Sequence, residues 1–225
     1  MTLSGSRLFG AAVSAMVIVA AALTGSSVLA ASSPSVSDTV TVGTQPGGVA
    51  VSPSGSYAYV TNRGSNSVSV IDTSTNTVTD TVTVGSSPRG VAFTPSGSYA
   101  YVTNYGANTV SVIDTSDYST TSVTVGSDPM GVAITPSGAY AYVTNYGSNS
   151  VSVIDTSTNT VTATVTVGTS PAGVAFTPNG SYAYVANYSS GSVSVISTGL
   201  GASSGGGSAG GGGSAAPQVV SVDLD

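Results

Sequence analysis

The tetrapeptide Tyr-Val-Thr-Asn stands at residues 59–62 and returns at 101–104 and 142–145, followed by the variant Tyr-Val-Ala-Asn at 184–187. The copies are spaced by about 42 residues, a period typical of arrays built from one supersecondary unit. Within each unit, runs of Val, Ile, Thr and Tyr alternate with turns that contain Pro, Gly, Asn and Asp. This pattern predicts four short antiparallel strands per unit, which is the blade of a β-propeller.

The third unit illustrates the expected strands. Proline and glycine mark the breaks between β-branched runs, and no helical period is present. We therefore expect strands at 132–135, 140–144, 150–154 and 160–167. The fold class predicted for the chain is all-β, a β-propeller made of four repeats with four antiparallel strands each.

Three longer segments recur in the units, namely Pro-x-Gly-Val-Ala, Pro-Ser-Gly-x-Tyr-Ala-Tyr-Val-Thr-Asn and Val-Ser-Val-Ile-Asp-Thr. Over residues 38–198 the chain resembles the YVTN family of β-propeller repeats. That family includes secreted and surface-layer proteins of bacteria and archaea, so the resemblance implies an exported propeller of such a source. The fourth unit departs from the pattern at Ala186 and Ser197, where the other units have Thr and Asp.

The number of blades depends on how the repeats begin and end. A run like the fourth strand of a unit precedes the first unit at 39–42, whereas the fourth unit stops at Ile196. The leading run is therefore expected to complete the last blade. A closed four-blade ring, an open arc and an eight-blade ring of two chains all remain open. Because an open arc leaves apolar faces and strand edges bare, we expect a homodimer or a higher assembly.

The composition is poor in charge. Only 5% of the 225 residues are charged, the formal net charge is −6, and Lys, Glu, His, Cys and Trp are absent. Without a basic patch, binding to nucleic acid is not expected. The usual general bases and activated nucleophiles are also missing, so we expect no enzyme and no cofactor. A lyase or hydrolase on a propeller fold is kept as a remote alternative.

The two ends of the chain have their own composition. Arg7, the apolar run 8–23 and a small-residue stretch ending at Ala30 predict a signal peptide at 1–30, with a transmembrane anchor as the alternative. A short leader follows at 31–37, and no membrane span is expected after cleavage. The Gly/Ser/Ala-rich stretch 199–216 predicts a flexible linker.

The last segment, 217–225, is strand-like and could serve as a tether, as an added strand or as the start of a missing module. Together with the signal peptide, these features predict a secreted, extracellular protein, with association with the cell surface as a further option.

Several repeated residues have architectural explanations. Asp72, Asp114 and Asp155 recur at one position, and an Asx-type turn explains them better than calcium, which needs six or more oxygen ligands. No metal site is therefore predicted. Tyrosines two residues apart, such as Tyr57 and Tyr59, are expected to pack between blades. The asparagines that end the tetrapeptides are expected to be turn residues.

The positions at which the repeats disagree are more informative about binding. One set lies in the loop that enters the first strand and the other follows the tetrapeptide, and in a propeller both loops lie on the same face. They are expected to gather around one channel mouth. The candidate binding face comprises Arg63, Arg89, Tyr105, Met130, Tyr146 and Tyr188. Ordinary loop variation is the competing explanation.

These observations predict a binding or adhesion scaffold. Its partner would be a cell-envelope glycan or protein, held through the tyrosine and arginine loops. A self-assembling structural component of the cell envelope is the main alternative.

Overall fold

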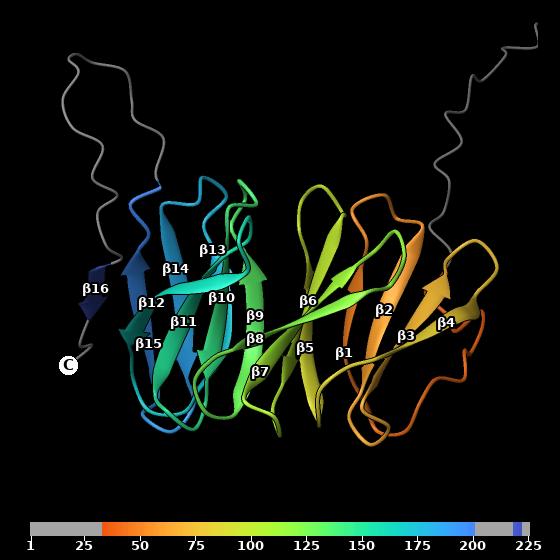
Figure 1. Ribbon diagram of the computed structural model, residues 1–225, viewed down its shortest axis with the longest axis horizontal. Helices are drawn as coiled ribbons and strands as arrows, with labels where there is room; N and C mark the ends of the chain where they lie inside the picture. Colours follow the sequence, from red (N-terminus) through yellow and green to blue (C-terminus); the bar gives the residue numbers. More distant parts are fainter. Residues whose placement is uncertain (1–32, 201–217, 222–225) are drawn as a thin grey trace, which may run out of the picture. The chain divides into compact units, whose positions relative to one another are not determined.

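The computed structural model describes residues 33–200 and 218–221, and every regular element in these ranges is a β-strand (Figure 1). Contacts divide the chain into Met1–Ser37 and Asp38–Asp225. All strands belong to the second unit. Within the described ranges there is no helix long and apolar enough to cross a bilayer.

Several predictions about the two ends of the chain concern residues outside these described ranges. The predicted signal peptide at 1–30 lies outside the described residues, as do nearly all of the predicted linker at 199–216 and the tail beyond Ser221. These assignments therefore stay predictions.

The strands form four antiparallel sheets in which chain neighbours are also spatial neighbours, and we number these sheets blades 1 to 4. Blade 1 consists of β1 (Pro46–Val51), β2 (Tyr57–Asn62), β3 (Ser67–Asp72) and β4 (Thr77–Thr83). Blade 2 consists of β5 (Pro88–Phe93), β6 (Tyr99–Asn104), β7 (Thr109–Asp114) and β8 (Thr120–Thr124). Blade 3 consists of β9 (Pro129–Ile134), β10 (Tyr140–Asn145), β11 (Ser150–Asp155) and β12 (Thr160–Thr166). Blade 4 consists of β13 (Pro171–Phe176), β14 (Tyr182–Asn187), β15 (Ser192–Ser197) and β16 (Gln218–Ser221). The predicted all-β propeller architecture is confirmed.

The turns follow from residues that tolerate a left-handed backbone. The glycine between the first and second strands has φ between 71° and 79° in all four blades, as at Gly55 and Gly138. A left-handed asparagine, such as Asn108, precedes the third strand in blades 1 to 3. Glycine and asparagine pay little for this conformation, so the punctuation seen in the sequence sets the strand ends.

A bulge interrupts the pairing of the first two strands opposite the tetrapeptide threonine. In blade 1, Pro46 pairs with Asn62 and Val49 pairs with Val60, so residues 47–48 together face Thr61. Blades 2 and 3 have the same interruption. Bulges of this kind bend a strand and redirect its side chains.

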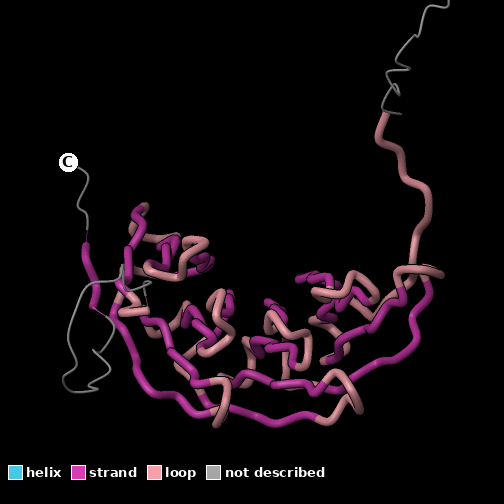
Figure 2. The backbone as a smooth tube through the Cα atoms, turned by 90° about the horizontal axis from the view of Figure 1, so that it is seen from above, coloured by secondary structure: helices cyan, strands magenta, loops and turns pink. Residues whose placement is uncertain are grey.

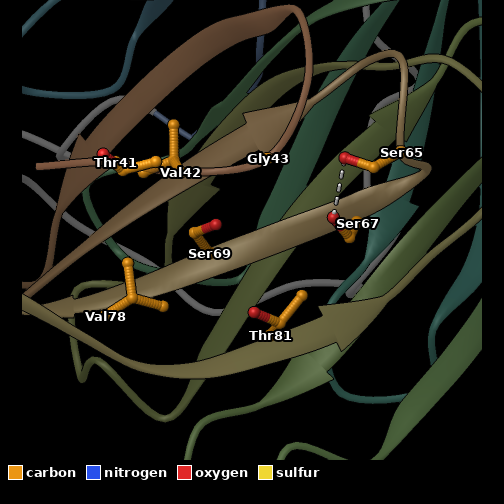
Figure 3. A pocket seen from close by; sticks show the side chains of 8 residues that line it. All are labelled: Thr41, Val42, Gly43, Ser65, Ser67, Ser69, Val78 and Thr81. Carbon is orange, nitrogen blue, oxygen red and sulfur yellow. Dashed lines mark hydrogen bonds between the residues drawn. The ribbon is translucent and has the colours of Figure 1, made fainter.

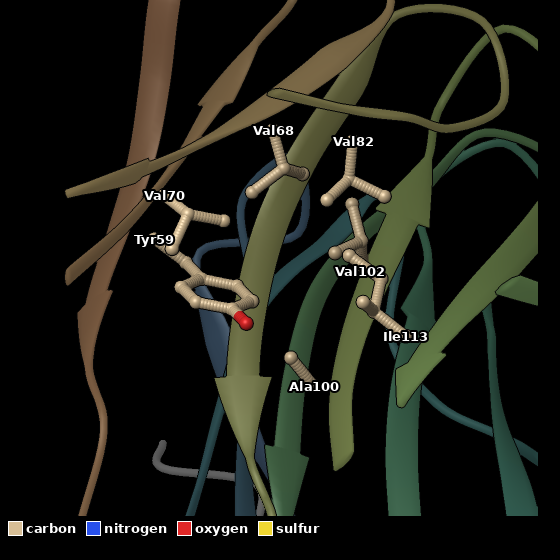
Figure 4. Close-up of a cluster of buried hydrophobic side chains, with 7 residues drawn as sticks. All are labelled: Tyr59, Val68, Val70, Val82, Ala100, Val102 and Ile113. Atoms are coloured by element: carbon tan, nitrogen blue, oxygen red, sulfur yellow. The ribbon is translucent and has the colours of Figure 1, made fainter. Parts of the chain in front are cut away.

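The core lies between neighbouring blades. Figure 4 shows the cluster between blades 1 and 2, in which Tyr59 packs with valines of its own blade and with residues such as Val102 and Ile113 of the next. The Tyr59 ring meets the edge of Phe93 with the ring centroids 4.7 Å apart. Equivalent clusters surround Tyr101 and Tyr142. Blades 1 to 3 therefore each bury an apolar face against the next blade along the chain.

The four blades follow an open arc (Figure 2). Their first strands β1, β5, β9 and β13 contact one another in that order. The two end faces remain bare: Val49 and Val51 of β1 are 67% and 58% exposed, and Tyr184 of β14 is 47% exposed. Of the three arrangements left open by the sequence, the single chain adopts the open arc, and a closed four-blade ring is wrong for it.

The last blade is completed differently from the prediction. Residues 39–42 form no strand, and β16 pairs antiparallel with Ser194–Ser197 of β15 instead. The physical reason is the open arc, which leaves the leading run next to blade 1 and away from blade 4. A segment from the other end of the chain takes the edge of β15.

Candidate functional site

A pocket with a volume of about 290 Å³ lies on the face formed by the loops before each first strand and after each second strand. We call it the mouth pocket. Blades 2, 3 and 4 each contribute two residues to its lining, which consists of Arg89, Tyr105, Met130, Tyr146, Ala172 and Tyr188. Five of the six residues predicted as a binding face are therefore neighbours in the fold.

Local structure explains why these residues meet. Arg89, Met130 and Ala172 each follow the proline that opens a first strand, within or beside the bulge. The tyrosines each follow the asparagine that ends a second strand. The backbone N–H of Tyr105 donates to the carbonyl of Ser87 at 3.1 Å, and Tyr146 and Tyr188 repeat this bond. The two loops of a blade are thus tied together at the mouth.

The tetrapeptide threonine joins one blade to the next at the same place. In blade 2 the Thr103 hydroxyl accepts a hydrogen bond from the Gly90 backbone at 2.8 Å and donates to the carbonyl of Met130 at 2.7 Å. Thr61 and Thr144 make the equivalent pair of bonds. We call this arrangement the threonine clamp. Blade 4 has Ala186 at this position and therefore lacks the clamp.

Arg89 carries the positive charge of the mouth pocket. Its guanidinium carbon lies 4.9 Å from the centroid of the Tyr105 ring, a cation–π geometry. Its Nε is buried and has no hydrogen-bond partner among the described residues. A buried donor without a partner is costly, so a ligand oxygen would be favourable here.

Arg63 is the predicted face residue that the structure keeps away from the pocket. It follows Asn62 in blade 1 and is exposed. The residues that line the pocket come from blades 2 to 4, and Arg63 is not among them. Ala172, by contrast, was not among the predicted binding residues, although its position in the repeat marked it as variable.

The tetrapeptide asparagines are not turn residues, contrary to the prediction. None of the four has a positive φ. Asn104 is buried and its side-chain amide donates to the hydroxyls of Thr109 and Ser111, at 3.0 and 2.9 Å. Strand pairing with the third strand holds the backbone of Asn104 extended. Its side chain therefore bonds the hydroxyls of β7.

The repeated aspartates close turns on the opposite side of the blades. The Asp155 carboxylate accepts bonds from the hydroxyl and the backbone N–H of Ser157, and these bonds lower its pKa. Asp72 and Asp114 hold Ser74 and Ser116 in the same way. The described residues include no cluster of three or more acidic or other metal-ligating side chains.

The buried tyrosines serve packing. Burial raises the pKa of Tyr101 and of Tyr142 to about 12, so both phenols stay neutral. The Tyr101 hydroxyl donates to the side-chain oxygen of Asn159 in blade 3 at 2.6 Å. These side chains are fixed by the fold, whereas Tyr188 of the mouth pocket is exposed and Tyr105 and Tyr146 are half-buried, so a ligand can reach them.

Comparison with known proteins supports the fold and adds a functional direction. A family described as lactonase, 7-bladed beta-propeller, matches residues 13–121, somewhat less than half of the chain. No curated protein sequence matches the chain.

Solved structures match as well. A structure described as Kuenenia stuttgartiensis hydrazine synthase matches at 31% identity with a TM-score of 0.63, covering 72% of this chain and 48% of that one. Candidate 6-phosphogluconolactonases from Bacteroides uniformis and Bacteroides fragilis match at 18% and 22% identity, with TM-scores of 0.60 and 0.59. Each of these two matches covers 68% of this chain and 50% of the other. The chain thus spans about half the length of these structures.

The expectation that the chain is not an enzyme is contradicted by these matches. The matching family is a lactonase family, and two of the similar structures are candidate lactonases. The expectation relied on the absence of His, Cys, Glu and Lys from the sequence, and this absence does not exclude similarity to a lactonase family.

Proposed function

We propose that the mouth pocket binds a carbohydrate that carries a carboxylate, such as a sugar acid or a uronic-acid oligomer. The observation that carries the proposal is Arg89, whose guanidinium lies over Tyr105 with a buried Nε that lacks a partner among the described residues. A guanidinium binds carboxylate oxygens through paired hydrogen bonds. The tyrosines offer flat apolar faces with hydroxyl groups at their edges, which suits a sugar ring.

A second candidate function, hydrolysis of a sugar lactone, is favoured by the lactonase family match. A lactone is the internal ester of a sugar acid, so its hydrolysis product belongs to the ligand class proposed above. Attack of water on the ester carbonyl develops negative charge on the carbonyl oxygen. The Arg89 guanidinium is the group in the mouth pocket that would stabilise this charge.

We further propose that the protein is an exported propeller of the YVTN type and that its ligand belongs to the cell envelope. Support comes from the signal-peptide pattern at 1–30 and from the repeated segments over 38–198. An acidic glycan of the cell envelope would fit both the proposed export and the positive charge of Arg89 in the mouth pocket.

Calorimetric titration of the full chain tests the binding proposal. The probes are oligogalacturonate and gluconate, with maltohexaose as the neutral control. We expect the acidic probes to bind and Arg89→Gln or Tyr146→Ala to weaken binding at least tenfold. Thr164→Val, on the exposed surface of β12, is the matched control and should leave binding unchanged. Equal binding of neutral and acidic probes, or no effect of Arg89→Gln, would contradict the proposal.

Proton release from glucono-1,5-lactone at constant pH tests the second candidate. We expect turnover above the spontaneous rate, lost in Arg89→Gln and retained in Thr164→Val. A rate equal to that of buffer alone would remove lactone hydrolysis and would leave the binding proposal standing.

A further inference from the structure

The two bare ends of the arc are the two halves of one type of interface. Inside the arc, the tyrosine of each second strand is covered by the first strand of the next blade, as Phe93 of β5 covers Tyr59. The residues equivalent to Val91 and Phe93 in blade 1 are Val49 and Val51, which are exposed. The residue equivalent to Tyr59 in blade 4 is Tyr184, which is also exposed. Each end therefore presents what the other end lacks.

The leading segment carries the sequence of a fourth strand. Asp-Thr-Val-Thr-Val-Gly stands at 38–43 and again, unchanged, at 80–85. In the second copy, Thr81, Val82 and Thr83 pair with β3, with Val82 opposite Val68. The first copy pairs with no strand of the described chain. In the complete blades a segment of this kind pairs with the third strand of the blade. The partner of residues 38–43 would therefore be a third strand whose outer edge is not fully paired.

The end of the leading segment lies against blade 1 in the same way as the end of one blade lies against the next blade inside the arc. A Cβ on Gly43 would collide with the side chain of Asn62, just as one on Gly85 would collide with Asn104. Figure 3 shows Thr41, Val42 and Gly43 beside β3, where they line one wall of a cavity of about 340 Å³. Residues 41–43 thus occupy the place that the outgoing strand of a preceding blade takes elsewhere in the arc.

The matching vacancy lies on blade 4. β15 pairs with β14 along its inner edge; on its outer edge β16 pairs with Ser194–Ser197, and among the described residues no strand pairs with Ser192 and Val193 on that edge. Val193 is 49% exposed, whereas its equivalents Val68 and Val151 are fully buried. If residues 38–42 paired with β15 in the register that β4 has with β3, Val40 would lie opposite Val193. At the positions where the two segments overlap, residues 38–42 would displace β16 from the edge of β15.

We propose that a second copy of this chain closes the ring. Residues 38–42 of each chain would form the outer strand beside β15 of the other, and each Val49–Val51 face would cover the other chain's Tyr184. A second copy is favoured over self-closure because the arc superposes on about half of each similar propeller chain, with TM-scores near 0.60. The angle between neighbouring blades of the arc is thus that of a propeller formed by about twice as many residues.

Closure would change the mouth pocket. In the single chain, blades 2 to 4 each bring to the mouth one residue that follows the bulge proline and one that follows the tetrapeptide, as Met130 and Tyr146 do for blade 3. The second copy would place Gly47 and Arg63 beside Ala172 and Tyr188 of the other chain. Arg63, which does not line the pocket in the single chain, would then join the site, and the ring would contain two arginines from each copy.

Disulfide trapping in the full chain tests this inference, because the chain has no cysteine of its own. Directly opposed residues of antiparallel strands lie close enough for a disulfide. Mixing Val40→Cys protein with Val193→Cys protein and oxidising should give a covalent heterodimer, and light scattering should give the mass of two chains. Thr164→Cys, exposed on β12, replaces Val193→Cys as the control and should not cross-link.

Other outcomes would overturn the inference. A single-chain mass with no cross-link, or an internal link within the Val40→Cys/Val193→Cys double variant, would mean that the ends do not meet in a second copy. A ladder of larger species would mean an open filament. As a second variant, Val49→Asp replaces an exposed residue and should leave the fold intact while reducing the mass to one chain; an unchanged mass would also contradict the two-chain ring.

Discussion

Tyr59, Tyr101 and Tyr142 are at most 2% exposed, whereas Tyr184, at the same position of the repeat, is 47% exposed. The strands around these residues are nearly identical in sequence, and all four tyrosines lie on second strands with the same pairing to the third strand. The difference is the blade that follows. In this molecule the burial of a core residue is decided by the neighbouring repeat, so the ends of the arc differ from its interior without differing in local structure.

The largest expected difference between the interior and the end of the arc is the stability lost when the equivalent tyrosines are truncated. Tyr101→Ala should lower the free energy of unfolding by about 3–5 kcal/mol, because it removes a large buried side chain and leaves a cavity. Tyr184→Ala should cost about 1 kcal/mol or less when measured at concentrations too low for chains to associate. Urea denaturation of both variants gives the two values. Equal losses would mean that the fourth tyrosine is covered in the single chain, contrary to the open arc.

The threonine clamp gives the next largest effect. Thr103→Val keeps the shape of the side chain and removes the hydroxyl that satisfies the Gly90 N–H and bonds the Met130 carbonyl. We expect a loss of about 2 kcal/mol in unfolding free energy, since buried backbone groups lose a partner. The control Thr164→Val, at an exposed position, should change stability by less than about 0.5 kcal/mol. Identical denaturation curves for the two variants would show that the clamp contributes nothing.

Blade 4 offers the reverse experiment. Ala186→Thr would restore the missing hydroxyl, and in a two-chain ring its acceptor would be the Gly47 carbonyl of the other copy. The dimer should tighten by about 1 kcal/mol at each of its interfaces, the usual gain from one hydrogen bond. Sedimentation equilibrium measures the dissociation constant. Ala186→Val has the same shape without the hydroxyl, and if it tightened the dimer equally the added bond would not be the cause.

The smallest effect concerns the turn aspartates, which are alike in the interior and at the ends. The Ser157 hydroxyl and N–H bonds hold the pKa of Asp155 below its ordinary value of about 3.9. The carboxylate therefore adds stability above about pH 4, and this contribution is lost as the pH falls through the lowered pKa. Thermal midpoints between pH 2 and pH 6 should fall less for Asp155→Asn than for the parent. Ser157→Ala should flatten the profile similarly, and parallel profiles for all three proteins would contradict the assignment.

The blades could be predicted from the sequence because their determinants are local. Alternating β-branched residues, the Pro-Ser-Gly turn and the Asp-Thr-Ser turn each act within a few residues. The gathering of Arg89 and the tyrosines was also predictable, since the repeat period alone places both loops on one face. The binding role assigned to those residues is still a prediction.

The features that could not be predicted depend on contacts between segments far apart in the sequence or on comparison with other proteins. The choice between 39–42 and 218–221 as neighbour of β15 is a competition between segments far apart in the chain. The burial of Asn104 requires the serine and threonine hydroxyls of β7 to be known as neighbours. The match of residues 13–121 to a lactonase family could not be predicted, because no residue type in the composition indicates that chemistry.

The threonine clamp also has a consequence for how such a protein can diversify. Thr61, Thr103 and Thr144 bond the main-chain carbonyls of residues 89, 130 and 172, and leave the side chains at these positions out of the bond. Arginine, methionine and alanine therefore occupy equivalent places without any change in how the blades are joined. A lineage built on this plan can exchange its contact residues one repeat at a time while each joint stays constant, so new ligand preferences can arise without loss of folding.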